Sequence, residues 1–251
     1  MKASSLGMPT ERALLVLEYL AERKVPVSIR EIATDLSIPK PTANRLIALL
    51  IHLGFVSRWP GRTVTIAARL LDLASSVMRA YAESPAVNLV LKGLASDIGE
   101  SVSIGAMIGG ELIYLHSVDS SAPLALYFRK GQTAPLHCTS SGKVHLSLLS
   151  DETLEKFLSN ANLERHTLKT ITSKFELIDE LTKVRHQGHA KSIEEYVVGV
   201  AGAAVPIYDS RDNILAALSV AGPVTRLDYS KLEELIPRLK ESAAKLTDSA
   251  Y

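Results

Sequence analysis

The chain has 251 residues, 47% of them hydrophobic and only 5% aromatic, with a formal net charge of +1. This length allows one large domain or two smaller ones, with mainly aliphatic cores. A single cysteine, Cys138, excludes an intramolecular disulfide and disfavours a zinc site built from several cysteines. No apolar run is long enough to cross a bilayer and no secretory signal is recognisable. We therefore expect a reduced, cytoplasmic protein with no membrane partner.

The charges are distributed unevenly. Residues 1–66 hold nine Lys or Arg against five Asp or Glu, whereas residues 67–251 hold nineteen against twenty-two. No acidic residue lies between Asp35 and Asp72, although five Lys or Arg do. A basic segment of this kind is typical of a surface that binds nucleic-acid phosphates, although a solvated face can carry the same charges by chance.

Residues 10–22 and 28–36 are predicted to form two helices, because their apolar residues recur at helical spacing. Thr10 is the expected N-cap of the first helix. Ser28, followed three residues later by Glu31, is a capping box that opens the second.

A third helix is predicted from near Pro39 to Leu53. Pro39 and Pro41 occupy positions that only the first turn of a helix tolerates. The N-terminal end of a recognition helix enters the major groove, and its free N–H groups and positive dipole favour phosphate. The polar face at this end carries Lys40, Thr42, Asn44 and Arg45.

Residues 55–58 and 63–66 alternate like strands around a turn at 59–62, which predicts a β-wing after the three helices. Arg62 at the tip and Arg58 could reach a groove or the backbone. Trp59 could stack on DNA or anchor the wing. The pattern indicates a winged helix-turn-helix with the predicted DNA-binding residues Lys40, Thr42, Asn44, Arg45, Arg58 and Arg62; Thr42 and Asn44 are candidates for base edges.

The remainder predicts an α+β domain with an antiparallel sheet, because strands precede helices and a strand pair then precedes a last helix. A helix from 67 to about 80 carries an apolar stripe wide enough to pack against a second copy or both domains. Helices are expected at 86–98, 142–149, 151–158, 173–187 and 227–246, and strands at 102–107, 111–118, 124–128 and 214–220, with an apolar segment at 197–208 and a turn at 209–213.

Three stretches together resemble the IclR family of bacterial transcription regulators. The first is the Glu-Arg-Ala-Leu, Glu-Ile-Ala, Pro-Lys-Pro-Thr-Ala-Asn-Arg-Leu and Leu-Gly-Phe-Val series. The second is Gly131 to Lys143, with Pro-Leu-His and Ser-Gly-Lys. The third combines Gly188-His-Ala, the Glu194-Glu195 pair, Gly-Val, Pro-Ile and Ala-Leu-Ser-Val-Ala-Gly-Pro. Their order and spacing cover nearly the whole chain.

The resemblance implies a winged helix-turn-helix DNA-binding domain (1–66), a linker helix (67–84) and a GAF-like effector-binding and oligomerisation domain (85–251). Such proteins act on double-stranded operator DNA as homodimers or homotetramers. Ligand binding would favour one dimer geometry and so change operator affinity. The effector would be a small organic molecule, of carboxylate or aromatic-acid type, and no cofactor is expected.

The same resemblance places the small-molecule pocket around Ser141, Gly142 and Ser219. Ser hydroxyls and N–H groups at the start of this helix could also bind a ligand carboxylate. The chain departs from the family by having Ser37 before the recognition helix, Ser192 or Ile193 at an acidic position, Gly202 at a frequent cysteine and Ala221 at a serine. The last three predict a larger and less polar ligand than a bare keto acid. The predicted effector-binding residues are Ser140, Ser141, Gly142, Glu194 and Ser219.

The same residues allow other functions. Ser140 and Lys143 form a Ser-x-x-Lys pattern that could serve a serine-dependent or GAF-like enzyme, but its usual companion motifs are absent, so no catalytic residue is predicted. The Glu194-Glu195 pair could act in acid–base chemistry, or one member could order its loop. The residues His116, His137, Cys138 and His145 lack paired ligand spacing, so no metal is predicted. A protein-binding winged helix without a DNA role is the remaining alternative.

Overall fold

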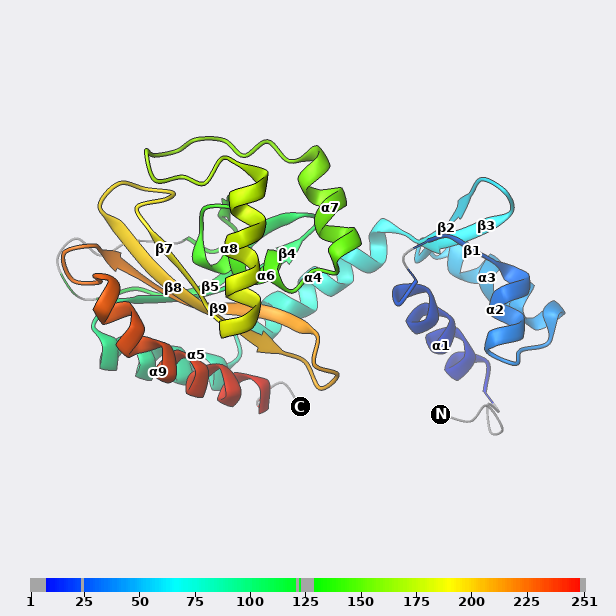
Figure 1. The fold of residues 1–251 in the computed structure, drawn as a ribbon. Coiled ribbons are helices and arrows are strands. Elements are labelled where there is room, and N and C mark those ends of the chain that lie inside the picture. The colour runs from blue at the N-terminus through cyan, green and yellow to red at the C-terminus, as the bar shows by residue number, and fades with distance from the viewer. Residues whose placement is uncertain (1–7, 24, 121, 123–128, 249–251) are drawn as a thin grey trace. The chain divides into compact units, whose positions relative to one another are not determined.

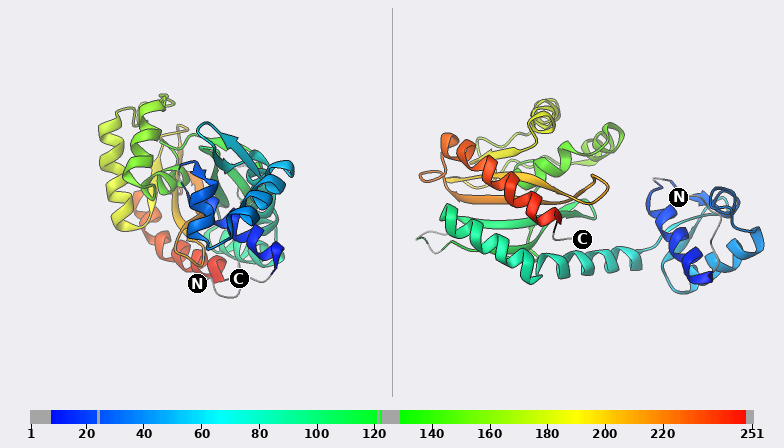
Figure 2. Two further views of the ribbon diagram at one scale, coloured as in Figure 1. Left: turned by 90° about the vertical axis from the view of Figure 1, so that its right-hand side faces the viewer. Right: turned by 90° about the horizontal axis from the view of Figure 1, so that it is seen from below.

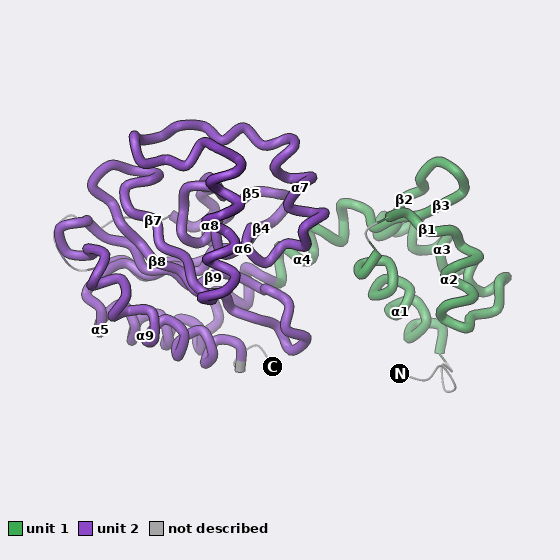
Figure 3. The backbone as a smooth tube through the Cα atoms, viewed as in Figure 1, with its two compact units in different colours: residues 1–77 green, residues 78–251 purple. Residues whose placement is uncertain are grey.

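A computed structural model describes residues 8–23, 25–120, 122 and 129–248. The chain divides into two compact units, residues 1–77 and 78–251 (Figure 3). The division falls inside α4 (Ala68–Ala82), within the linker segment expected at 67–84. Each unit is described separately below.

Unit 1 is a three-helix domain with a small antiparallel sheet (Figure 1). Its sheet has the order β1-β3-β2. The buried aliphatic core includes Val16, Ile32 and Ile47, one from each helix. These residues belong to the apolar faces that the helical spacing in the sequence indicated. The elements are α1 (Pro9–Ala21), β1 (Val27–Ser28), α2 (Ile29–Asp35), α3 (Lys40–His52), β2 (Val56–Trp59) and β3 (Thr63–Ile66).

Two local expectations for unit 1 have different outcomes. The capping box is confirmed, since the Ser28 side chain accepts from the Glu31 N–H while the Glu31 carboxylate accepts from the Ser28 N–H. The Thr10 cap is wrong, because α1 begins one residue earlier at Pro9, with Met8 as its N-cap. Proline tolerates the first helical position, which lets the helix start without a side-chain cap.

Unit 2 is an α+β domain around a six-stranded antiparallel sheet in the order β6-β5-β4-β9-β8-β7. Its fold class therefore matches the expectation. The strands are β4 (Ser101–Ile108), β5 (Glu111–Val118), β6 (Thr133–Ala134), β7 (Ala190–Ile193), β8 (Val200–Tyr208) and β9 (Ile214–Pro223), and the helices are α5 (Pro85–Ile98), α6 (Ser140–Ser147), α7 (Asp151–Asn160), α8 (Lys174–Gln187) and α9 (Tyr229–Asp248).

Helices cover both faces of this sheet (Figure 2). On one face, α5 packs over β4 and β5 while α9 packs over β8 and β9, and the two helices lie side by side above a core that includes Val205 and Leu218. On the other face, α6 and α8 pack over the intervening residues, including Ala204 and Ala217. The strands are buried on both sides, which explains why their sequences are continuously apolar rather than alternating.

The short strands β1, β6 and β7 were not predicted. The strand expected at 124–128 lies outside the described residues. Helix α6 begins at Ser140, two residues before the expected start, because Thr139 rather than a later residue is its N-cap. No helix among the described residues combines the length and the apolar character that a membrane span requires.

Candidate DNA interface and effector cavity

The turn between α2 and α3 is a Schellman motif. The Ser37 N–H donates to the Thr34 carbonyl and the Ile38 N–H to the Ala33 carbonyl, while the Ile38 side chain is buried. Ser37 has a φ of +53°, so the strain expected from a non-glycine residue at this turn is present. The motif determines the angle at which α3 leaves α2.

Helix α3 presents a basic and polar N-terminal end. Lys40, Asn44 and Arg45 are exposed and Thr42 is half-buried, while the opposite side inserts into the core. The N-cap residue Pro39 has no side-chain hydrogen bond to the helix, so the first-turn N–H groups have no side-chain cap. Neither Lys40 nor Arg45 forms an ion pair with any described residue. This end of α3 is therefore available to a polyanion.

The wing adds two further exposed cations. Arg58 lies on β2, and Arg62 lies in the turn with a φ of +62°, next to Gly61. The Thr63 hydroxyl donates to the Pro60 carbonyl and closes the turn. Trp59 is 56% exposed, so much of its side chain is accessible to a ligand.

Arg69, also in the acid-free segment, has a different role. Its guanidinium donates to the Leu53 carbonyl and stacks on the Phe55 ring, 4.7 Å from the centroid. It thus connects the start of α4 to the end of α3, and the charge pattern alone could not distinguish it from Arg58 and Arg62.

Unit 2 contains a cavity of about 230 Å³ between the sheet and the start of α6. Hydroxyl, amide and apolar groups line it, and none of the described lining residues is Lys or Arg. The lining residues are Tyr114, Gln132, Thr139, Ser140, Ser192, Tyr196, Val197, Val200, Ala201, Gly202, Ser219, Val220 and Ala221.

The start of α6 forms one wall of the cavity. The Thr139 hydroxyl accepts from the Gly142 N–H and donates to the Pro135 carbonyl. The N–H groups of Ser140 and Ser141 precede the first intrahelical bonds and carry the positive end of the dipole. The helix is buried along its whole length, so these groups act in a medium of low polarity.

The sequence placed five residues at this pocket, and the cavity brings together two of them, Ser140 and Ser219. Gly142 has a packing role instead, because a Cβ there would lie 2.3 Å from the Leu136 carbonyl oxygen. Ser141 is buried beside it and does not line the cavity; its hydroxyl has no partner among the described residues. Glu194 also lies outside the lining.

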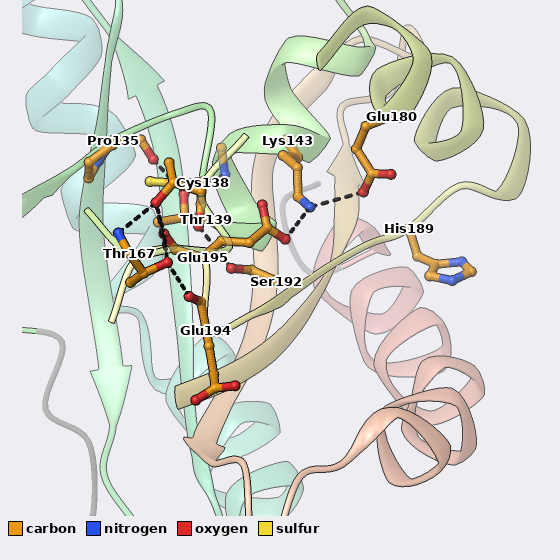
Figure 4. Close-up of polar contacts among 12 residues, drawn as sticks. Pro135, Cys138, Thr139, Lys143, Thr167, Glu180, His189, Ser192, Glu194 and Glu195 are labelled. Atoms are coloured by element: carbon orange, nitrogen blue, oxygen red, sulfur yellow. Dashed lines mark hydrogen bonds and ion pairs between the residues drawn. The ribbon is translucent and has the colours of Figure 1, made fainter. Parts of the chain in front are cut away.

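Glu194 orders the loop between β7 and β8. With a φ of +58°, it accepts from the Gly199 N–H and pairs with Lys169, which holds the pKa of its carboxyl below the ordinary value. Its carbonyl and that of Glu195 accept from the Thr167 hydroxyl (Figure 4). This is the loop-ordering role that the sequence allowed for one member of the pair. The hydroxyl of Ser192, on β7, donates to the Cys138 carbonyl.

Ser219, which lines the cavity, is paired with a second serine that does not line it. Ser103 on β4 and Ser219 on β9 are register partners, and their hydroxyls are 2.9 Å apart. Ser192, Gly202 and Ala221, three of the four departures from the family pattern, also lie on the lining. A Cβ at Gly202 would lie 2.7 Å from the Val220 carbonyl oxygen, so the backbone as placed accommodates only glycine there.

Lys143 has no access to the cavity. Its side chain is 1% exposed, and its ammonium donates to Glu180 at 2.9 Å and to Glu195 at 2.8 Å (Figure 4). Burial raises the pKa of Glu195, although the ammonium opposes this shift. A lysine held by two carboxylates is a poor base for Ser140, so the geometry does not support the Ser-x-x-Lys reading.

The four residues considered for a metal do not form one cluster in the structure. His145 is buried and its Nε2 donates to the Gly105 carbonyl, while the Nε2 of His116 has no partner among the described residues. His137 and Cys138, in contrast, lie together with His166, which the spacing did not single out. Tyr114, Gln132 and Tyr196 are lining residues that the sequence also missed, because their positions carried no motif.

Comparisons with known proteins cover both units. The family described as the IclR helix-turn-helix domain matches residues 9–60, and the one described as bacterial transcriptional regulator IclR C-terminal matches residues 84–248. The chain is 29% identical to a probable transcriptional regulator, SauR, of Cupriavidus necator, over 94% of both chains.

Two solved structures are also similar. The Thermotoga maritima IclR has a TM-score of 0.64 and 26% identity, covering 95% of this chain and 97% of its own. The inducer-binding domain of Acinetobacter PobR, a double mutant in complex with 3-hydroxybenzoic acid, has a TM-score of 0.59 and 28% identity, covering 63% of this chain and 94% of its own.

Proposed function

Since the chain belongs to the IclR family of bacterial transcription regulators, and is a DNA-binding regulator rather than an enzyme, we propose that a small organic acid in the unit 2 cavity controls its affinity for operator DNA. Unit 1 is the DNA-binding domain, α4 is the linker, and unit 2 binds the effector and supports oligomerisation. Because its target is chromosomal DNA, the protein acts in the cytoplasm.

The observation that carries the effector proposal is the composition of the cavity wall. The N-terminal end of α6 supplies N–H groups and the Ser140 hydroxyl for one anionic group, whereas no described lining residue is cationic. Two further polar lining residues, Tyr114 and Gln132, can bind a second substituent. Val197, Val200 and Ala201 supply the apolar wall. A single carboxylate on an apolar body satisfies this arrangement better than a diacid.

The volume supports a ring-sized ligand. A cavity of about 150 Å³ accommodates benzene, so about 230 Å³ leaves room for a ring with a carboxylate. The bound 3-hydroxybenzoic acid of the Acinetobacter inducer-binding domain is a molecule of this class. The absence of bulk at Gly202 and Ala221 agrees with a larger, less polar ligand than a bare keto acid.

A calorimetric titration tests the effector class. Aromatic monocarboxylates should bind, while the matched neutral amides and two- or three-carbon keto acids bind at least tenfold more weakly. Ser219→Val, which adds bulk to the cavity lining, should weaken binding, and Ser159→Ala, on the exposed face of α7, should leave it unchanged. Binding of the short acids alone would refute the proposal.

For the DNA interface we propose that Thr42 and Asn44 read base edges, while Lys40, Arg45, Arg58 and Arg62 contact phosphates or a groove. Sequencing genomic fragments retained by the protein would identify the operator, which we expect to be an inverted repeat. On that operator, Arg45→Ala should weaken binding and lower the slope of log K against log salt by about one. Arg238→Ala, which changes an exposed residue of α9 in unit 2, is the matched control. Unchanged binding by Arg45→Ala would favour a protein-binding winged helix.

We further propose that the protein is a homodimer or a homotetramer. Leu73 and Val77, one turn apart on the same face of α4, are 50 and 58% exposed, and Leu71 on the other side of the helix is 57% exposed, which leaves apolar side chains of the linker uncovered in one chain. Sedimentation should give a dimer or tetramer for the parent protein. Replacing all three residues by Lys should produce a monomer if α4 joins two copies.

A further inference from the structure

Three side chains of unit 2 converge outside the effector cavity. His137, Cys138 and His166 each offer one ligand atom, and these atoms lie within 4.8 Å of one another. The first two precede α6, whereas His166 belongs to the segment between α7 and α8. The tertiary fold, not the spacing of residues, creates the cluster.

The hydrogen bonding of His137 leaves one of its ring nitrogens available. Its Nε2 lies 3.0 Å from the Glu164 carbonyl oxygen, which can only accept, so Nε2 carries the proton and Nδ1 carries the lone pair. Metal-binding histidines commonly donate their second N–H to a backbone carbonyl in this way, which fixes the tautomer and the ring orientation.

Cys138 and His166 differ in exposure. Cys138 is fully buried, and its carbonyl accepts from the Ser192 hydroxyl, so the thiol has little freedom. His166 is exposed on its loop, with its ring edge-on to Tyr196 at 5.0 Å. In a tetrahedral zinc site with Zn–S of about 2.3 Å and Zn–N of about 2.0 Å, neighbouring ligand atoms lie roughly 3.5 Å apart. The exposed side chain of His166 has room to supply the contraction that this requires.

We propose that His137, Cys138 and His166 bind one divalent transition-metal ion of the zinc class. On binding, the Cys138 thiol loses its proton to solvent and coordinates as the thiolate, while both imidazoles coordinate in neutral form. Nitrogen and sulfur ligands together suit Zn²⁺ rather than Mg²⁺ or Ca²⁺. The fourth position faces a cavity of about 440 Å³, lined in part by His137, His166, Glu111 and Glu164, where water completes the coordination.

The ion would also stabilise a wall of the effector cavity. Tyr196, which contacts His166, lines both cavities. Ser192, which bonds the Cys138 carbonyl, lines the effector cavity. The metal site is nevertheless defined without reference to any effector or operator, so its test is independent of the proposed function.

Cobalt(II) is the probe, because its thiolate charge-transfer and tetrahedral d–d bands report ligand type and geometry. The full-length protein, free of any histidine tag, is titrated with Co²⁺ and then with Zn²⁺. We expect saturation at one ion per chain, both band types, and displacement of the cobalt by zinc.

Three variants decide the assignment. Cys138→Ser should abolish the charge-transfer band, and His166→Ala, at an exposed position where the fold is not at risk, should weaken cobalt binding at least tenfold. His186→Ala, an exposed histidine on α8 outside the cluster, should match the parent. The absence of saturable binding in the parent, or an unaltered affinity in His166→Ala, would overturn the proposal even if Cys138→Ser fails to fold.

Discussion

Lys143 illustrates how a residue within a family motif can have a structural role. Its ammonium is buried between Glu180 and Glu195, which come from α8 and from the loop after β7. The three groups connect α6 to two neighbouring segments behind the effector cavity. A buried charge is tolerated only when it is paired, so each member depends on the others.

We therefore predict that Lys143→Met destabilises unit 2 by about 3–5 kcal/mol, because Glu195 would remain buried without its counter-ion. Urea unfolding followed by circular dichroism measures the loss. Combining Lys143→Met with Glu180→Gln and Glu195→Gln should recover much of it, because no buried charge then remains. Equal stability of the single variant and the parent would contradict the ion-network role.

Ser37 is a second residue whose backbone conformation matters more than its side chain. It occupies the left-handed position of the Schellman motif, where a Cβ is unfavourable. The family resemblance identified the position, and elementary sterics predicted the strain that the structure contains.

Replacing Ser37 by Gly should stabilise unit 1 by about 0.5–1 kcal/mol, as relief of strain outweighs the greater freedom of glycine in the unfolded chain. The fluorescence of Trp59, the only tryptophan, follows unfolding of this unit selectively. Ser57→Gly in β2, where φ is not positive, provides the comparison and should destabilise. A loss of stability in both variants would refute the strain argument.

At the scale of elements, periodicity predicted the long helices well, whereas β8 (Val200–Tyr208) was recognised from the sequence only as an apolar segment. The capping box was predictable because it has a local hydrogen-bonding cause. The strands β1 and β6, two residues each, were not readable, because so short a segment has no period and forms only when a neighbouring strand is present.

The candidate effector site was predictable only in part, for a similar reason. Ser140 and Ser219 were found because motifs mark them. Tyr114, Gln132 and Tyr196 line the same cavity from elements far apart in sequence, and only the sheet order brings them together. Conversely, Gly142 lay within a motif but serves the close approach of α6 to Leu136.

At the scale of the whole molecule, the histidines whose pKa is lowered by burial all lie in unit 2. Burial lowers the pKa of His116, His137, His145 and His189 below the ordinary 6.5. Below pH 6.5 the unfolded unit therefore binds more protons than the folded one, so acidification favours unfolding. Burial raises the pKa of Glu195, so protonation of this carboxyl favours the folded unit as the pH falls. This is one group acting against four.

We predict that unit 2 loses stability as the pH falls from 7 to 5, with the loss continuing until the lowered folded-state pKa values are passed. Amide hydrogen exchange of β8 and β9 measures this at each pH, after correction for intrinsic rates. His145→Gln, which keeps a donor for the Gly105 carbonyl, should reduce the pH dependence. Stability that rises between pH 7 and 5 would reverse the predicted sign.

The small residues of the cavity wall have an evolutionary consequence. Gly202 cannot be enlarged without moving the backbone of β9. Its register partner Ala221, the neighbouring Ser192 and the loop residue Val197 can change with little effect on the hydrophobic clusters on the two faces of the sheet. Selection can thus alter ligand preference by single substitutions at the rim while the central glycine keeps the strands in place. Divergence of effector within this lineage should accordingly be recorded at positions 192, 197 and 221 before it reaches position 202.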